Sequence, residues 1–287
     1  MTLVLNEEEI MLRDSAAGFL AESANVSAFR AHRDNPSASG FDRALWESIA
    51  EMGWCGIAID EQYGGLSYGF TGLGLVLEQM GKHLSVSPFN STVLMAGSVL
   101  EQCGTEAQKQ EWLPKIASCE VVMTLAIQEG TFFDLDQLSQ SVTTAPDGFT
   151  VQAEKRQVLD AIAADAFLVV GRDSDGFQGF IVGAADVSVH AQSMVDARSS
   201  GTVVINTTCS KEAQLDPTAM NGKGLTRALD QIHIGLAAEL LGLSTEAFER
   251  TVAYLRERKQ FGKVIGSFQG LQHRAADLFA ELELCRS

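Results

Sequence analysis

The sequence has few prolines and few aromatic residues, and it lacks long apolar runs. Of its 287 residues, 5 are proline and 7% are aromatic. No stretch approaches the ~20 consecutive apolar residues that a membrane helix requires, so we expect no membrane span and no membrane partner. With 46% hydrophobic and 20% charged residues, the composition is typical of a soluble globular protein large enough for two or three packed domains.

Cysteine and histidine occur without the spacings that bind metals. The five cysteines form no CxxC pair, and the five histidines form no HxxxH or HExxH arrangement. The sequence therefore predicts no structural metal site. We interpret the cysteines as scattered thiols of a cytoplasmic protein; they are Cys55, Cys103, Cys119, Cys209 and Cys285.

Positive charge is scarce relative to negative charge. The chain has 21 Lys and Arg against 37 Asp and Glu, a formal net charge of -16. Such an acidic protein is a poor partner for nucleic acid or for an anionic membrane surface, although a local basic patch can still hold a phosphate. The first residues, "MTLVLNEEEIMLRD", have no basic segment ahead of an apolar one, so we expect no signal peptide.

The first region, residues 1–120, is predicted to be an all-α domain. Apolar residues recur every three to four positions in "EEEIMLRDSAAGFLAESA" and in "GLGLVLEQMGKHL", which is the period of an amphipathic helix. Asn6 followed by Glu9 predicts a capping box at the start of the first helix.

The middle region, residues 121–223, is predicted to be an antiparallel β domain. It contains the runs "VVMTLAI", "GFTVQAE", "DAFLVVGR", "GFIVGA", "VSVHAQSM" and "GTVVINTT". They are rich in Val, Ile, Phe and Thr and are bounded by turn residues, which is typical of strands. Most are too close together for a helix to separate them, so we expect a sheet or barrel of antiparallel strands.

The last region, residues 224–287, returns to the helical period. Ala237, Leu240, Leu241 and Phe248 are part of a predicted buried stripe that continues through Val252 and Leu255. The fold class is therefore α+β, with an N-terminal all-α domain, a middle antiparallel β domain and a C-terminal helical bundle. Because the sequence stops within a helical pattern, at "ELELCRS", we expect this bundle to be incomplete as given.

The stretch "YLRERKQFGKVIGSFQGLQHRAAD", residues 254–277, closely resembles the signature of the acyl-CoA dehydrogenase family. In that family a helix ends in Arg-x-Gln-Phe-Gly and is followed by Ile-Gly-x-Phe-Gln. Two further stretches are similar to the family in the same order along the chain: "EMGWCGIAIDEQYGG", residues 51–65, and "LAIQEG" with the hairpin that follows it, residues 125–172. The resemblance spans nearly the whole sequence.

The resemblance implies FAD as cofactor and assigns residues to it. Arg258 would face the pyrophosphate of FAD, because a guanidinium is a planar, bidentate donor. Gln260 would be a polar neighbour, Phe261 an apolar contact, and Gln269 closes the Ile-Gly-x-Phe-Gln motif. In the family this turn reaches the flavin of a neighbouring subunit, so the match implies a homo- or hetero-oligomer, a dimer or tetramer. The alternative for this turn is a solvated basic helix end without function.

The middle region departs from the family pattern. Gln128, Glu129 and Gly130 stand where many members have Thr-Glu-Pro, and Gln157, two residues after Lys155, stands near the position of a Trp that shields the flavin. Gln128 would offer its amide to the edge of the flavin. This divergence is similar to the branch that acts on bulky acyl-CoA thioesters, such as those of steroid side-chain degradation, in which two different subunits often pair.

No catalytic base is assigned. The family removes the α-proton of the thioester with a Glu or Asp, and in most members that Glu lies further downstream than residue 287. In relatives that use the helix opening the C-terminal domain, the resemblance places Ile232 at the position of the base. Asp230 and Glu239 are near in sequence, but neither matches the motif, so the catalytic residue stays unknown.

Three functional hypotheses remain open. The first is an FAD-dependent acyl-CoA dehydrogenase of fatty acid or lipid metabolism that converts an acyl-CoA to its 2-enoyl form and passes electrons to an electron-transfer flavoprotein. The second is a non-catalytic partner subunit of the same fold that completes the flavin site of a sister chain. The third is a flavin oxidase or hydroxylase acting on a substrate other than a CoA ester, since fold alone does not fix chemistry.

Overall fold

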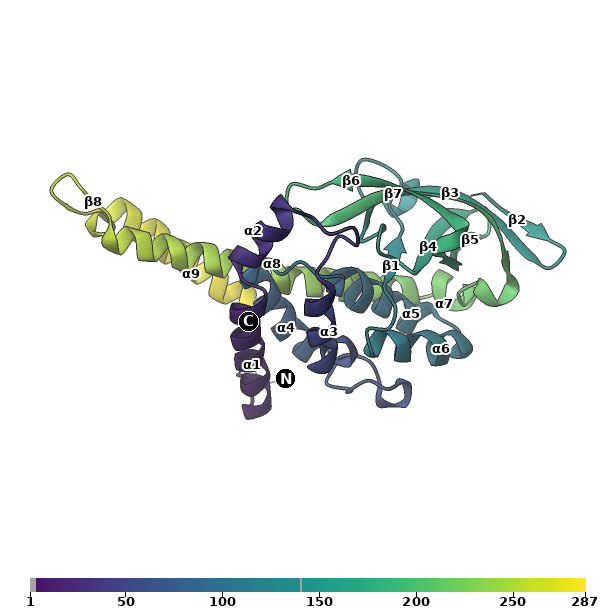
Figure 1. The fold of residues 1–287 in the computed structure, drawn as a ribbon, viewed down its shortest axis with the longest axis horizontal. Helices are drawn as coiled ribbons and strands as arrows, with labels where there is room; N and C mark the ends of the chain where they lie inside the picture. Colours follow the sequence, from purple (N-terminus) through teal and green to yellow (C-terminus); the bar gives the residue numbers. More distant parts are fainter. Residues whose placement is uncertain (1–3, 140) are drawn as a thin grey trace. The chain divides into compact units, whose positions relative to one another are not determined.

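The computed structural model describes residues 4–139 and 141–287, and along the chain helices are followed by strands and then by helices again (Figure 1). This is the predicted order of elements. The first three residues of the stretch examined for a signal peptide lie outside the described residues. The chain divides into two compact units. Unit 1 comprises Met1–Phe29, Thr71–Ser85 and Ile234–Ser287, and unit 2 comprises Arg30–Phe70 and Val86–His233.

Unit 1 is helical. It contains α1 (Glu7–Ser23), most of α4 (Gly69–His83), the larger part of α8 (Gly224–Glu257) and α9 (Gln269–Arg286). The predicted capping box of α1 is present, because the Glu9 amide donates to Asn6 Oδ1 at 2.9 Å and the Asn6 amide donates to Glu9 Oε2 at 2.8 Å. In Figure 1, α9 runs back beside the end of α8, and Phe248 and Phe279 join them with ring centroids 6.3 Å apart.

Two glycines let α4 and α8 approach each other closely. A Cβ atom on Gly81 would lie 1.9 Å from the Glu239 carbonyl oxygen, and one on Gly242 would lie 1.8 Å from the Glu78 carbonyl oxygen. No side chain fits at such distances, so glycine is required at both positions. Lys82 Nζ adds an ion pair to Glu249 at 2.7 Å across the same helix pair.

The predicted buried stripe of α8 is only partly correct. Ala237 is exposed and Leu240 is 58% exposed, while Leu241, Phe248, Val252 and Leu255 are half-buried. The period of the stripe is helical as expected. However, α8 packs on α4 through its glycines rather than through the whole stripe, so part of the stripe faces solvent in this chain.

The helices of unit 2 precede and follow its strands. They are α3 (Arg43–Glu51), the π-helix η3 (Phe89–Ala96), α5 (Gly97–Cys103), α6 (Glu106–Ala117) and α7 (Pro217–Asn221), and α2 (Val26–Asp34) begins in unit 1 and ends in unit 2. Seven of the eight residues of η3 are buried. A π-helix within a helical region often marks a functional site, and this one was not predicted from the sequence.

Two sheets form the centre of unit 2. The larger sheet has the order β2-β3-β7-β6 and is antiparallel throughout, with β2 (Ser141–Ala145), β3 (Gly148–Leu159), β7 (Ser199–Ser210) and β6 (Val187–Ser193). The smaller has the order β1-β4-β5, with β1 (Met123–Ala126), β4 (Ala166–Asp173) and β5 (Gly176–Gly183).

The antiparallel expectation is wrong for one strand pair. β4 and β5 are antiparallel, but β1 runs parallel to β4, with Met123 opposite Ala166. The chain between β1 and β4 forms the β2-β3 hairpin of the larger sheet before it returns, so β1 and β4 enter their sheet in the same direction. All six predicted strand runs are strands, whereas β2 was not predicted.

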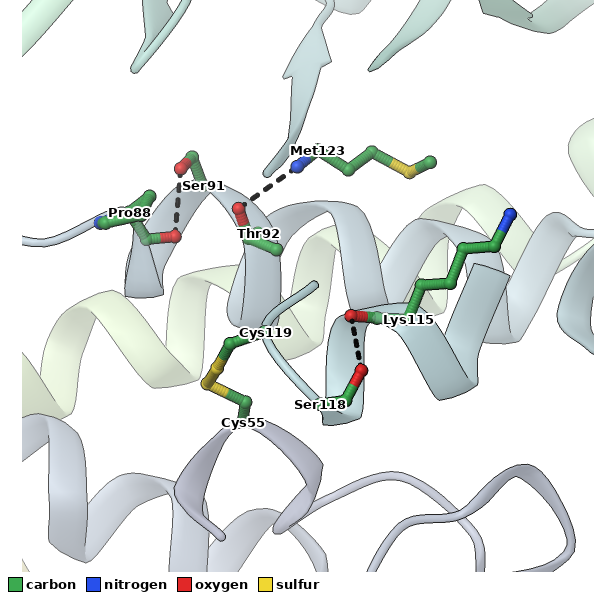
Figure 2. Close-up of a disulfide and its surroundings, with 8 residues drawn as sticks. All are labelled: Cys55, Pro88, Ser91, Thr92, Lys115, Ser118, Cys119 and Met123. Carbon is green, nitrogen blue, oxygen red and sulfur yellow. Dashed lines mark hydrogen bonds between the residues drawn. A yellow bond between two sulfur atoms is a disulfide. The ribbon is translucent and has the colours of Figure 1, made fainter. Parts of the chain in front are cut away.

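A disulfide corrects the interpretation of the cysteines. Cys55 and Cys119 are bonded, with Cα atoms 6.3 Å apart, while Cys103, Cys209 and Cys285 are free. Figure 2 shows the bond between the short helix η1 (Trp54–Gly56) and the loop that precedes β1. The two cysteines are 64 residues apart in the sequence, so their pairing depends on tertiary packing that no local spacing could reveal.

Candidate functional site

The hairpin that follows α8 carries most of the residues assigned to the cofactor. β8 (Lys259–Gln260) pairs with β9 (Lys263–Val264), and the two residues between them have positive φ, +54° at Phe261 and +79° at Gly262. Such a two-residue turn needs positive φ at both positions, which suits glycine and is rare for phenylalanine. The turn thereby holds the Phe261 ring in solvent, where its side chain is 90% exposed.

The base of the hairpin positions Arg258. Its amide donates to the Tyr254 carbonyl at 2.9 Å, and its carbonyl accepts from the Ile265 amide at 2.8 Å. The side chain is exposed, and within residues 4–139 and 141–287 its guanidinium forms no ion pair or side-chain hydrogen bond. All five of its N–H donors are therefore open to an anionic ligand.

Beside the hairpin, the start of α9 forms a hollow. Its volume is about 400 Å³, and it is lined by Phe261, Phe268, Gly270, Leu271 and Arg274. Phe261 and Phe268 meet edge to face with ring centroids 6.2 Å apart, and Lys263 Nζ lies 4.4 Å from the centroid of Phe268. The hollow thus joins an aromatic wall to cationic groups, a combination that suits a planar, anionic molecule.

Gln260 and Gln269 flank this hollow in the sequence, and the structure leaves both side chains exposed. Gln260 is the last residue of β8 and Gln269 is the first residue of α9. Neither lines the hollow itself. Their assignment to the cofactor therefore stays a prediction.

Gln128 belongs to unit 2 and has a partner there. It follows β1, and its Nε2 donates to Gln157 Oε1 at 2.7 Å and to the Gly130 carbonyl at 3.2 Å. Gln157 lies in an irregular part of β3, with a φ of +52°. The structure therefore brings these two glutamines together, and it forms a polar, amide-bearing patch at the end of β1.

A buried ion pair supports the segment that carries Gln128. Lys155 is fully buried; its ammonium pairs with Glu129 and donates to the Val170 carbonyl at 2.6 Å. Burial lowers the pKa of Lys155, and the Glu129 carboxylate opposes that shift. The other oxygen of Glu129 accepts from the Ser139 amide at 2.6 Å. Sequence analysis missed this pair, because Lys155 stands among polar residues in β3 and nothing local marks it as buried.

The carboxylates considered for proton abstraction are not suitably placed. Asp230 is exposed and Ile232, at the position implied for the base, is buried. Glu239 is 8% exposed and lies in the close α4–α8 contact. Its burial agrees with the predicted packing role for this residue and gives no support to a catalytic one.

The described part of the chain contains no cluster of three or more His, Cys, Asp or Glu side chains that could bind a metal. No described helix is long and apolar enough to cross a membrane.

The hairpin fits the diphosphate and adenine part of FAD. Arg258 and Arg274 form no ion pair within the described residues, and two unpaired guanidinium groups suit a diphosphate. The exposed Phe261 ring and the adjoining hollow suit an aromatic base. In unit 2, the Gln128–Gln157 amide pair suits the polar edge of a conjugated ring. The residues present therefore fit the cofactor that the sequence motif implies.

Comparison with known proteins shows the family of this chain. The sequence profile "Acyl-CoA dehydrogenase, N-terminal domain" matches residues 6–120, and "Acyl-CoA dehydrogenase, C-terminal domain" matches residues 222–287. The mitochondrial short/branched chain specific acyl-CoA dehydrogenase of Bos taurus is 28% identical over 296 residues, which cover 98% of this chain and 67% of the relative.

Solved structures of the same family superpose on nearly the whole chain. The Tcur3481–Tcur3483 steroid ACAD matches with a TM-score of 0.86 and 28% identity, covering 98% of this chain and 75% of the other. The ChsE4–ChsE5 complex of Mycobacterium tuberculosis matches with a TM-score of 0.83 and 25% identity, covering 99% and 76%. The profiles, the relative and the two structures agree, and this chain belongs to the acyl-CoA dehydrogenase family.

Proposed function

We propose that this chain is a subunit of an FAD-dependent acyl-CoA dehydrogenase that oxidises an acyl-CoA thioester to its 2-enoyl form. The family consists of oxidoreductases whose cofactor is FAD, and both terminal domains of the family match this chain. The electrons would pass to an electron-transfer flavoprotein, as the family resemblance implies. The similarity to a steroid ACAD supports a bulky acyl group, such as a steroid side chain, whereas the 28% identity to the short/branched chain relative supports a smaller one, and turnover of the two classes of acyl-CoA distinguishes them.

The observation that carries this proposal is the hairpin at the end of α8. Arg258 projects from a fixed backbone position and forms no ion pair among the described residues, while Phe261 is held in solvent by a left-handed turn. Exposure of a large aromatic ring in a strained turn is unfavourable unless a ligand or partner covers it. We infer that Arg258 and Arg274 bind the diphosphate of FAD and that Phe261 contacts its adenine.

The amide pair of unit 2 would bind the flavin end of an FAD molecule. Bound flavin would supply the acceptor for the hydride that leaves the β-carbon of the acyl group. The Gln128 and Gln157 side chains would then orient the ring by hydrogen bonds to its polar edge, in place of the Thr and Trp of other members. The Lys155–Glu129 ion pair would keep these amides in position, because it fixes the segment after β1.

We further propose three domains, 1–120, 121–223 and 224–287, in a homo- or hetero-oligomer. The similarity to the ChsE4–ChsE5 complex supports a heteromer. A cytoplasmic location also stays a prediction. The Cys55–Cys119 disulfide argues against it, because disulfides are more typical of an oxidising compartment.

A second function is favoured by the residue at position 232. Ile232 is buried where the motif implies a carboxylate, and Glu239 is packed against α4. A subunit with this arrangement would complete the flavin site of a sister chain through its hairpin and leave proton abstraction to that chain. We keep this partner role as the second candidate function.

The visible absorption spectrum of the purified protein, alone and with a co-expressed sister subunit, tests both functions. Flavin bands from the chain alone that bleach with an acyl-CoA establish a dehydrogenase in its own right. Flavin that is retained only with the sister supports the partner role. Flavin in neither preparation contradicts both. Oxygen consumption during turnover would instead indicate the third hypothesis, an oxidase or hydroxylase.

A further inference from the structure

The end of β3 adopts an unusual backbone conformation. Its pairing with β7 shifts register between Lys155 and Val158, and Gln157 and Asp160 both have a φ of +52°. Neither residue is glycine, so both occupy a sparsely populated conformation that persists only where the surroundings hold it. Because this bulge directs Gln157 toward Gln128, whatever holds the bulge also holds the amide pair.

Backbone hydrogen bonds hold the bulge from two sides. The Arg156 amide donates to the Gln128 carbonyl at 2.7 Å, and the Thr124 hydroxyl donates to the Leu159 carbonyl at 2.6 Å. The Asp160 amide donates to the Ser199 carbonyl at 2.9 Å. The first two bonds come from β1 and the residues after it, and the third comes from β7.

The side chain of Asp160 attaches the bulge to the π-helix η3. The carboxyl group is 7% exposed, and its Oδ2 lies 2.6 Å from Ser91 Oγ. Ser91 Oγ also lies 3.0 Å from the Pro88 carbonyl, a bond drawn in Figure 2. A hydroxyl has a single proton, and Ser91 Oγ shares it as donor between Asp160 Oδ2 and the Pro88 carbonyl, with the shorter contact to Asp160. The Asp160–Ser91 bond therefore ties the end of β3 to η3.

The surroundings of Asp160 make its carboxyl harder to ionise than an exposed one. Burial raises the pKa of Asp160 to about 6; Ser91 and Arg198 oppose this shift and Asp196 adds to it. Arg198 and Asp196 lie in the loop between β6 and β7 and form an ion pair with each other at 3.7 Å. The Asp196 carboxylate thus offsets part of the effect of the Arg198 charge on the pKa of Asp160.

The sign of the resulting pH dependence follows from linkage. An acid whose pKa is higher in the closed bulge than in an open, solvated one favours the closed bulge at low pH. The preference is lost as the pH rises from the ordinary range of an aspartate, about 4, to about 6. Above that range the carboxyl is ionised in both states, and the preference does not change further.

From these contacts we propose that Asp160 is a positioning residue, and that its buried carboxyl, through its bond with Ser91, holds the Gln157 bulge in the conformation that presents the Gln128–Gln157 amide pair to the flavin. Only the last step of this assignment, the presentation of the amide pair to the flavin, rests on the proposed function. The link between Asp160, Ser91 and the bulge concerns the protein with or without a cofactor.

Hydrogen exchange of the whole protein without added FAD tests the link. Protection factors of the peptides that contain the Arg156 and Asp160 amides would be compared at pH 5.5 and pH 7.5, after correction for intrinsic exchange. We expect protection in the wild type to fall about fourfold between these values, as linkage gives for a carboxyl whose pKa rises from about 4 to about 6. Asp160→Asn, a neutral isostere, should remove this pH dependence and keep the protection of the wild type at pH 5.5.

Two further variants complete the test. Ser91→Ala removes the partner on η3 and should give low protection at both pH values. Glu101→Gln alters a half-buried carboxyl, whose pKa is also raised by burial, and should leave the fourfold change in place. A fourfold change that survives in Asp160→Asn overturns the proposal, as does normal protection in Ser91→Ala.

The dissociation constant of FAD for the same proteins separates this inference from the proposed function. Binding that weakens with pH in the wild type but not in Asp160→Asn extends the link to the flavin. No FAD binding in any protein would contradict the proposed function, while the exchange data would still decide the role of Asp160.

Discussion

Arg256 and Arg258 are two residues apart, but their local structures differ. Arg256 lies in the last turn of α8, where a cation is favourable to the helix dipole. Arg258 lies beyond the helix, and its carbonyl accepts from Ile265 at the base of the hairpin. The two residues can therefore be compared directly: Arg256 is placed to stabilise the end of α8, and Arg258 is placed to bind a ligand.

Arg258→Ala is expected to weaken FAD binding by about 10- to 100-fold, since a charge-assisted hydrogen bond contributes about 1.5–3 kcal/mol. Arg258→Lys should restore only part of the loss, because an ammonium cannot form the bidentate contact. Fluorescence titration with FAD, on the assembled oligomer, measures both. Arg256→Ala is the control and should bind FAD within about twofold of the wild type. Equal losses in the Arg256 and Arg258 variants would contradict the assignment.

At this scale, the sequence motif predicted the exposed residues of the hairpin and not the buried polar ones. Arg258 and Phe261 belong to a contiguous signature, so their neighbourhood is local and can be read from the chain. Asp160 meets Ser91 across 69 residues, and its raised pKa is a consequence of burial. No pattern within β3 carries that information.

At the scale of helices and strands, the sequence predicted the elements that have a regular hydrophobic period. It did not predict most features that depend on tertiary contacts. The six strand runs and the capping box at Asn6 depend on residues close in sequence. In contrast, the π-helix η3 and the Cys55–Cys119 bond depend on packing between distant segments. The parallel pairing of β1 with β4 belongs to the same group, since the strand pattern does not fix direction. Strand β2 is an exception, since it forms a hairpin with the adjacent β3 and was still missed.

The disulfide joins two elements and should stabilise unit 2 by limiting the unfolded chain. Closing a loop of 64 residues corresponds to about 4 kcal/mol on the chain-entropy estimate. Reduction should therefore lower the midpoint of denaturant unfolding, and Cys55→Ala/Cys119→Ala should do the same without reductant. Cys285→Ala, which alters an exposed free thiol, is the control and should leave the midpoint unchanged.

Thiol titration of the denatured protein decides whether the bond forms. Without reductant we expect 3 reactive thiols, those of Cys103, Cys209 and Cys285, and all 5 cysteines after reduction. Five thiols before reduction would contradict the crosslink and would agree with the original cytoplasmic interpretation.

For the whole molecule, the distribution of charge explains how an acidic protein can bind an anionic cofactor. The chain has a net charge of -16. Residues 254–264 contain two Arg and two Lys against one Glu, a local charge of 4 minus 1, or +3. Because screening limits the general field to about 10 Å at 0.1 M salt, this short segment can attract a diphosphate that the rest of the surface repels.

Three apolar side chains are exposed on α9, and we expect a second subunit to cover this surface. Leu278 and Phe279 are 52% and 54% exposed, and Leu284 is 74% exposed. Exposed apolar side chains grouped on one helix are typical of a protein interface. The family resemblance independently requires a neighbouring subunit at the hairpin, and α9 begins directly after that hairpin.

We therefore expect the chain to associate, alone or with its sister, into particles larger than its 30.8 kDa mass. Light scattering after size-exclusion chromatography would measure this. Leu284→Glu should shift the equilibrium toward the single chain, because a carboxylate would be buried without a partner at the interface. Val195→Glu, at a fully exposed loop position, should not. A particle of 30.8 kDa both alone and with the sister would contradict an oligomer. It would also contradict the proposal that Arg258 binds the FAD of a neighbouring subunit.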